Sequence, residues 1–226
     1  NKLHGTVQEL HGDKALVKDI ARCESAAGIA GVLQIASALE TFAVTVRDLD
    51  ADPWLLNVGN GTVDLRNKQL RPHNPADRCT KITTADYDPE QPRDQWETFL
   101  ETVQPDKGVR GFTQRLVGLA LLGEVREHVL GILTGTGANG KSVFTRTMHH
   151  TLGDYALTAE PDLFMHRDGA HPTGEMDLLG RRWVSVSETE KDRRLAEATM
   201  KRLTGGDRIR ARRMRQDFVE FQPSHT

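Results

Sequence analysis

Eight residues between positions 135 and 142 have the types and spacing of a phosphate-binding loop, G-x-x-x-x-G-K-[ST]. Glycines let the backbone wrap closely around an anion, and N–H groups at a helix start point toward phosphate oxygens. Lys141 would reach the β and γ phosphates of a nucleoside triphosphate, and the Ser142 hydroxyl would hold Mg²⁺. The expected cofactors are ATP and Mg²⁺. The candidate nucleotide-binding residues are Gly135, Thr136, Gly137, Ala138, Asn139, Gly140, Lys141 and Ser142.

The segments on either side of the loop supply the context that this motif needs. The apolar run 129–134 predicts a buried strand, and residues 143–148 predict the helix that follows the loop. A strand, a glycine-rich turn and a helix in this order favour nucleotide binding over an unliganded turn.

A carboxylate near the loop would complete the chemistry, because Mg²⁺ prefers oxygen ligands and an acid must orient the attacking water. Glu188 directly follows the β-branched run 182–187, which predicts a core strand. We therefore expect Lys141, Glu188 and Glu190 to be catalytic, and Ser142 and Glu188 to bind the metal. Alternatively, Glu188 and Glu190 are solvated residues at the end of a strand.

A basic segment lies in the last third of the chain. Although the formal net charge is −2, residues 181–215 contain 12 Lys and Arg against 5 Asp and Glu. Alternating cations after Gly205-Gly206 predict a hairpin that contacts a phosphate backbone without reading bases. A solvated face that pairs with acidic residues would have the same composition. The candidate DNA-binding residues are Lys201, Arg208, Arg210, Arg212 and Arg213.

The remaining elements predict two domains. Residues 13–50 have helical spacing with Gly28 and Gly31 as interruptions, and residues 54–70 predict two strands around the turn 59–61. The proline-containing segment 86–92 is typical of a linker. We therefore expect a mainly helical accessory domain with a β-hairpin at 1–92 and an α/β phosphate-loop core at 93–226.

Composition narrows the class of protein. No apolar run is long enough to cross a bilayer, and the two cysteines, Cys23 and Cys79, have no C-x-x-C neighbour. We expect a cytoplasmic protein with no membrane partner, disulfide framework or zinc site. The chain begins with Asn1 and ends shortly after the strand-like run 218–221, so we expect it to be a piece of a longer protein.

Four motifs in order resemble those of the superfamily 3 helicases of phage and plasmid replication, also called phage/plasmid primases or poxvirus-type helicase-primases. The first is similar to the signature of that family's N-terminal accessory domain, the second to its phosphate loop, the third to its acidic strand and the fourth to its DNA-contacting hairpin. These motifs are Leu55–Arg66 with Leu70–His73, Gly135–Ser142, Leu179–Glu188, and Met200–Asp207 with Ala211-Arg212.

The resemblance implies an AAA+ type ATPase that assembles as a homo-hexamer around DNA and works with other replication proteins in a bacterial host cell. By carry-over, Lys141 and Ser142 would hold phosphate and Mg²⁺, Glu188 would complete the site, and residues 201–213 would track the strand. The family's sensor Asn and arginine finger are expected after Thr226. No primase active-site motif is present in the sequence, so primase activity is not carried over.

Two other functions remain open at this stage. A nucleotide or small-molecule kinase also has a phosphate loop, and its phosphate-clamping lid would be rich in arginine. A nucleotide- and DNA-binding fragment without turnover is the second alternative. Stimulation by single-stranded DNA separates a helicase from a kinase.

Overall fold

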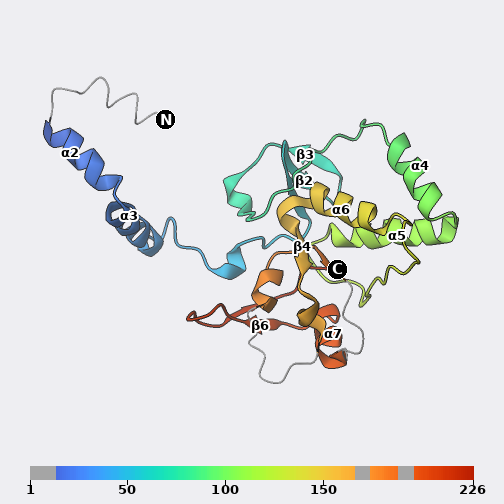
Figure 1. The fold of residues 1–226 in the computed structure, drawn as a ribbon. Coiled ribbons are helices and arrows are strands. Elements are labelled where there is room, and N and C mark those ends of the chain that lie inside the picture. The colour runs from blue at the N-terminus through green and yellow to red at the C-terminus, as the bar shows by residue number, and fades with distance from the viewer. Residues whose placement is uncertain (1–13, 166–173, 188–195) are drawn as a thin grey trace. The chain divides into compact units, whose positions relative to one another are not determined.

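The computed structural model describes residues 14–165, 174–187 and 196–226 (Figure 1). The chain divides into two compact units, residues 1–45 and 46–226. The first contains helices α2 (Lys14–Cys23) and α3 (Ala26–Ala38). The expected interruptions at Gly28 and Gly31 are wrong, because both lie inside α3. The break falls instead at Ser25, whose side chain caps α3 by accepting a hydrogen bond from Gly28 N at 3.0 Å.

The second unit opens with a short helical turn, η1 (Val46–Asp48), and a three-stranded antiparallel sheet. Its strands are β1 (Leu55–Val58), β2 (Gly61–Asp64) and β3 (Gln69–Arg71). Val58 pairs with Gly61 and Val63 with Leu70, so the expected hairpin is confirmed and a third strand extends it. Another turn, η2 (Pro75–Asp77), follows.

Three helices come next: α4 (Asp94–Val103), α5 (Lys107–Ala120) and α6 (Lys141–Leu152). The start of α5 is fixed by Asp106, whose side chain accepts a hydrogen bond from Val109 N at 2.9 Å. The expected helix after the glycine-rich loop is confirmed as α6. The turn η3 (Gly153–Tyr155) connects α6 to the next strand.

A parallel pair of strands forms the second sheet. In it β4 (Ala156–Ala159) runs beside β5 (Trp183–Val186), with Ala156 opposite Trp183. Thr226 lies along β5, because Thr226 N donates to Arg182 O at 3.0 Å and Val184 N donates to Thr226 O at 3.2 Å. The turns η4 (Pro161–Phe164) and η5 (Gly174–Leu178) lie between β4 and β5 in the chain.

Residues 197–221 form a helix and a hairpin. Helix α7 (Glu197–Thr204) precedes the antiparallel strands β6 (Ile209–Ala211) and β7 (Val219–Phe221). Inward-facing residues of these elements and Leu178 of η5 form one apolar cluster, made of Leu178, Leu203, Ile209, Ala211 and Phe221. The hairpin expected from the alternating cations is therefore confirmed, and its buried face fixes its position.

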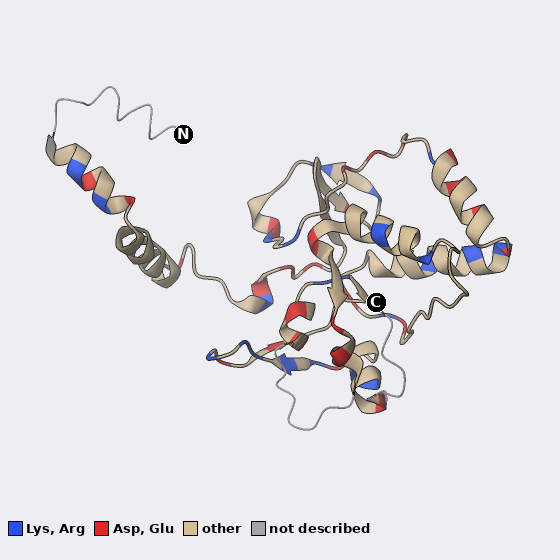
Figure 2. Cartoon of the chain, viewed as in Figure 1, with Lys and Arg blue, Asp and Glu red and all other residues tan. Residues whose placement is uncertain are grey.

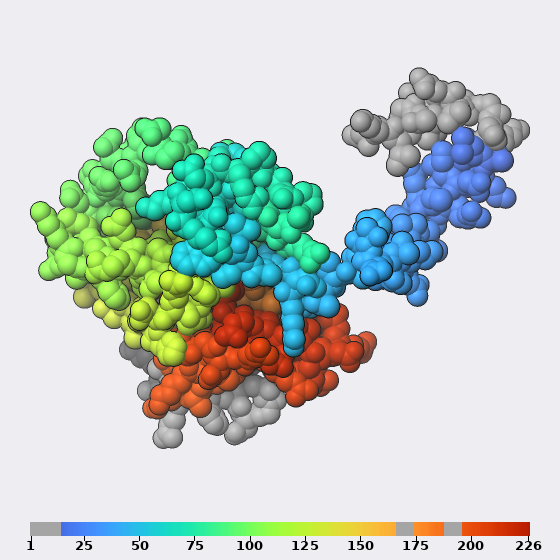
Figure 3. All heavy atoms as spheres, turned by 180° about the vertical axis from the view of Figure 1, so that it is seen from behind, coloured from blue at the N-terminus to red at the C-terminus, as the bar shows by residue number. Residues whose placement is uncertain are grey.

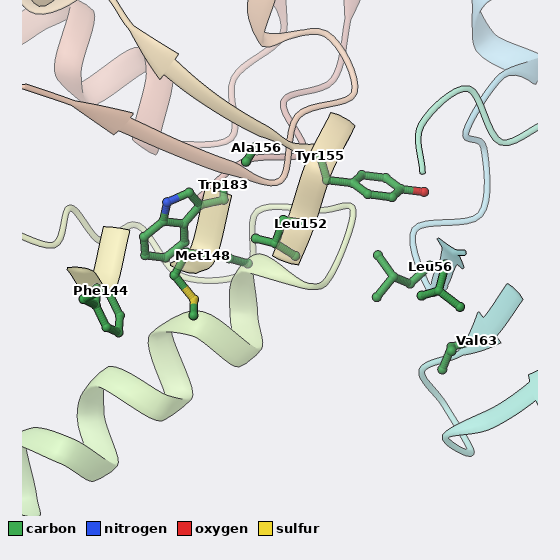
Figure 4. Close-up of a cluster of buried hydrophobic side chains, with 10 residues drawn as sticks. Leu56, Val63, Phe144, Met148, Leu152, Tyr155, Ala156 and Trp183 are labelled. Carbon is green, nitrogen blue, oxygen red and sulfur yellow. The ribbon is translucent and has the colours of Figure 1, made fainter. Parts of the chain in front are cut away.

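The main core joins the first sheet to the helix after the loop (Figure 4). Leu56 and Val63 from β1 and β2 belong to the same buried cluster as Phe144 and Met148 from α6 and Trp183 from β5. In Figure 3 the cyan and teal atoms of the β1–β3 region lie against later parts of the chain. Residues 46–226 thus pack as one unit. The expected boundary between residues 92 and 93 stays a prediction.

Arg182 is buried where these parts meet, with 3% of its surface exposed. Its guanidinium donates to Leu55 O of β1 at 2.5 Å and to Leu121 O, just after α5. It also lies 4.6 Å from the ring centre of Tyr155. Burial lowers the pKa of Arg182 and raises that of Tyr155 to about 12. One charged side chain therefore links β5 to β1, η3 and the end of α5.

The fold is a mixed α/β arrangement with small sheets. The expected buried strand at 129–134 is wrong, since these residues form no strand and Ile132 is 76% exposed. The physical reason is that a strand needs a hydrogen-bonded neighbour. Within the described residues, β4 and β5 pair with each other and neither pairs with 129–134. The AAA+ arrangement of the core remains a proposal.

Gly153 offers a test of how α6 is held against the segment after β3. It has φ +53°, and a Cβ there would lie 2.7 Å from Thr84 N and 2.9 Å from Ile82 O. We expect Gly153→Ala to lower the free energy of unfolding by about 2 kcal/mol or more. The measurement is chemical denaturation followed by circular dichroism.

Gly118→Ala is the matched control, because Gly118 lies in α5 and a Cβ there would meet nothing within 4 Å. We expect it to stabilise the chain by about 0.5–1 kcal/mol. If both variants unfolded at the same denaturant concentration, the close approach at Gly153 would not matter to stability.

Candidate functional site

The loop 135–140 has the open backbone that anion binding needs. Gly137 and Gly140 have φ of +105° and +82°, and Ala138 has φ +47°. Gly140 is the N-cap of α6 and has no side-chain cap. The first N–H groups of α6 therefore have no capping side chain, and the positive end of the helix dipole lies at the loop. This geometry suits an anion.

Lys141 folds back over the loop. Its ammonium donates to Gly135 O at 3.1 Å and to Asn139 Oδ1 at 2.9 Å. Both acceptors are neutral oxygens, and no described carboxylate lies within ion-pair distance of Lys141. The described residues give this ammonium no anionic partner, and an incoming phosphate would supply one.

Helix α4 packs closely against the loop at Gly140. A Cβ on Gly140 would lie 2.5 Å from Val103 Cγ1, so only glycine allows this approach. The ring of Trp96 stacks on Phe99 at 5.2 Å and on Phe144 of α6 at 6.0 Å. Phe144 in turn meets Trp183 of β5 edge-on at 6.2 Å. This row of aromatic rings runs from α4 through α6 to β5 and sets their spacing.

His149 is a second link between α6 and β5. Its Nε2 lies 2.7 Å from Ser185 Oγ, and burial lowers the pKa of the imidazole. The neutral ring is therefore a structural hydrogen-bond partner at neutral pH. No group of three or more His, Cys, Asp or Glu among the described residues could hold a metal ion.

The acidic half of the expected site consists of Glu188 and Glu190. Strand β5 ends at Val186, and Glu188 and Glu190 lie outside the described residues. Ser142 is exposed in the first turn of α6. The assignments of Ser142 and Glu188 to Mg²⁺, and of Lys141, Glu188 and Glu190 to catalysis, thus stay predictions. Of the expected nucleotide site, the structure brings together residues 135–142.

The structure places four of the five expected DNA-binding residues on the hairpin region, while Lys201 lies exposed on α7. Figure 2 shows Lys and Arg in blue on both elements. Arg208 pairs with Glu220 at 3.2 Å, and Arg213 pairs with Asp177 at 3.0 Å. Arg210 and Arg212 instead lie over the ring of Phe218, at 4.6 Å and 4.7 Å from its centre. The four hairpin arginines therefore fall into an acid-paired group and an aromatic-supported group.

Sequence reasoning missed Phe218, Glu220 and Asp177. A signal for the first two was present, because the alternation in 218–221 predicts a strand paired with 209–211. Asp177 lies 36 residues before Arg213 in the chain, and the sequence carries no signal for that ion pair.

Known proteins resemble this chain in its first half and along most of its length. Residues 2–105 match the family model described as "D5 N terminal like". The chain is 28% identical to "Putative helicase L207/L206" of Acanthamoeba polyphaga mimivirus, covering 79% of this chain and 19% of that protein. It is 26% identical to "Putative primase C962R" of African swine fever virus (isolate Warthog/Namibia/Wart80/1980), covering 87% and 21%. It is 27% identical to "Putative helicase 121R" of Invertebrate iridescent virus 3, covering 77% of this chain and 20% of that protein.

The match over residues 2–105 and the relatives named helicase or primase confirm the expected resemblance to the D5-like helicase-primase family. The chain spans about a fifth of the length of the curated relatives it matches. None of the helices in the described ranges is long and apolar enough to span a bilayer. These relatives come from viruses of eukaryotes, and the expected bacterial host stays a prediction.

Gly140 tests the support of the loop by α4. We expect Gly140→Ala to lower the free energy of unfolding by about 1 kcal/mol more than Gly137→Ala does. Both changes put alanine at a positive φ, but a Cβ at Gly137 would meet nothing within 4 Å. Chemical denaturation of the two variants measures the difference. Equal losses of stability would show that α4 does not constrain the loop.

Proposed function

We propose that the chain is the nucleotide-binding part of an ATP-dependent DNA helicase of superfamily 3, acting in DNA replication. One observation carries the proposal. The loop 135–140 opens onto the uncapped N-terminus of α6, and the Lys141 ammonium is held there by neutral oxygens. The names of the relatives support a role in replication as a helicase or primase.

The residues fit ATP and Mg²⁺ in the following roles. Backbone N–H groups of 135–142 and the Lys141 ammonium would bind the β and γ phosphates, and the Ser142 hydroxyl would hold Mg²⁺. Glu188 would bind the same metal ion and orient water, with Glu190 as a second acid. Mg²⁺ would neutralise the charge that develops on the phosphates.

DNA is the proposed macromolecular partner. The hairpin β6–β7 and α7 present the cations Lys201, Arg208, Arg210, Arg212 and Arg213. Arginine binds a phosphate backbone through charge without reading sequence. A homo-hexameric ring, with other replication proteins as partners, is part of the same proposal.

Replacing Lys141 tests the nucleotide site. We expect Lys141→Ala to weaken binding of a fluorescent ATP analogue at least tenfold while the unfolding temperature changes little, because the ammonium makes no buried ion pair with the described residues. Lys107→Ala is the control, since Lys107 is an exposed lysine at the start of α5. An unchanged affinity of the Lys141 variant would rule out the assignment of the site.

ATP hydrolysis with and without single-stranded DNA then decides the class of enzyme. Stimulation by DNA that disappears in the Lys141 variant supports a motor. Hydrolysis that is indifferent to DNA points to another phosphate-loop enzyme, such as a kinase. Binding of both ligands without hydrolysis points to a binding module within a longer protein.

A further inference from the structure

The hairpin β6–β7 sorts its arginines by register. Ile209 and Ala211 are fully buried, so the residues between and after them, Arg210 and Arg212, project from the opposite face of the strand. The ladder ends where Ala211 pairs with Val219, and one further step in the same register would set Phe218 opposite Arg212 and diagonal to Arg210. Phe218 is therefore placed to contact both guanidinium groups, and the distances of 4.6 Å and 4.7 Å show that it does.

The neighbouring acid does not compete for these two arginines. Glu220 lies directly opposite Arg210 in the register, yet its carboxylate bonds Arg208 at 3.2 Å. Arg213 is likewise occupied by Asp177. Phosphate would have to displace a carboxylate at Arg208 and Arg213. At Arg210 and Arg212 the described residues place no carboxylate in ion-pair contact.

We propose that Phe218 is a positioning residue for nucleic-acid binding, which holds Arg210 and Arg212 as a two-armed clamp for adjacent phosphates. This proposal deepens the proposed DNA contact and rests on it. An aromatic ring covers the face of a guanidinium group and leaves its N–H edge free for a bidentate phosphate. A long side chain held in this way loses less freedom on binding. Phe218 is 46% exposed, so stability alone does not require an aromatic ring there.

The variant Phe218→Leu removes the ring and keeps an apolar side chain of similar size. We expect it to weaken binding of a fluorescein-labelled oligo(dT) about fivefold in fluorescence anisotropy. The slope of log Kd against log salt should stay unchanged, because both arginines keep their charge. Phe218→Trp should bind the oligonucleotide with wild-type affinity, since Trp is the strongest aromatic partner for a cation.

The double variant Arg210→Ala with Arg212→Ala is the charge control, measured on the same 226-residue chain. It should weaken binding and also reduce the salt slope by about 1.4, the value for two phosphate contacts on a single strand. Binding of the fluorescent ATP analogue should be the same in all four proteins, which confirms that they are folded.

The outcomes separate the positioning role of Phe218 from the proposed DNA contact of the hairpin. If the double variant binds DNA weakly but Phe218→Leu binds like wild type, the positioning role is wrong and the hairpin contact stands. Equal weakening by Phe218→Leu and Phe218→Trp would also overturn the role, because the tryptophan ring should substitute. If the double variant binds like wild type, Arg210 and Arg212 do not contact the DNA, and the role of Phe218 fails while the proposed nucleotide site is untouched.

Discussion

The burial of Arg182 is the constraint on which the described core depends. A guanidinium group cannot be deprotonated at neutral pH, so it must find acceptors wherever it is buried. Here the acceptors are the carbonyl groups of Leu55 and Leu121, with the ring of Tyr155 against the cation. These partners come from β1, the end of α5 and η3. An unpaired buried charge is costly. The first sheet, the end of α5 and β5 must therefore pack in the one arrangement that brings these acceptors to Arg182.

This arrangement fixes the nucleotide loop indirectly. Arg182 adjoins Trp183, which begins the row of rings that passes through Phe144 to Trp96 under the loop. His149 adds a hydrogen bond between α6 and Ser185 of β5. The strand that leads toward Glu188 and the helix that carries Lys141 are thus held to each other by contacts outside the motif. A motif of glycines and one lysine supplies the chemistry, and its position comes from these aromatic and polar contacts.

The sequence predicts the parts of this site that depend on local chemistry. The loop 135–142, helix α6, strand β5 and the basic hairpin all follow from glycine placement or side-chain alternation. The strand at 129–134 was predicted wrongly, because apolarity alone does not supply a neighbouring strand. Arg182 and Phe218 were missed for a related reason. Their roles depend on partners across the fold or across a hairpin, and periodicity within one segment does not reveal partners.

The central claim is that the loop 135–140 and the start of α6 bind nucleotide phosphate. A crystal structure of the chain with Mg²⁺ and a non-hydrolysable ATP analogue tests it most directly. We expect the β and γ phosphates on the backbone N–H groups at the start of α6, with the Lys141 ammonium moved from Asn139 Oδ1 to a phosphate oxygen. An analogue bound elsewhere, with Lys141 still bonded to Gly135 O and Asn139 Oδ1, would contradict the account.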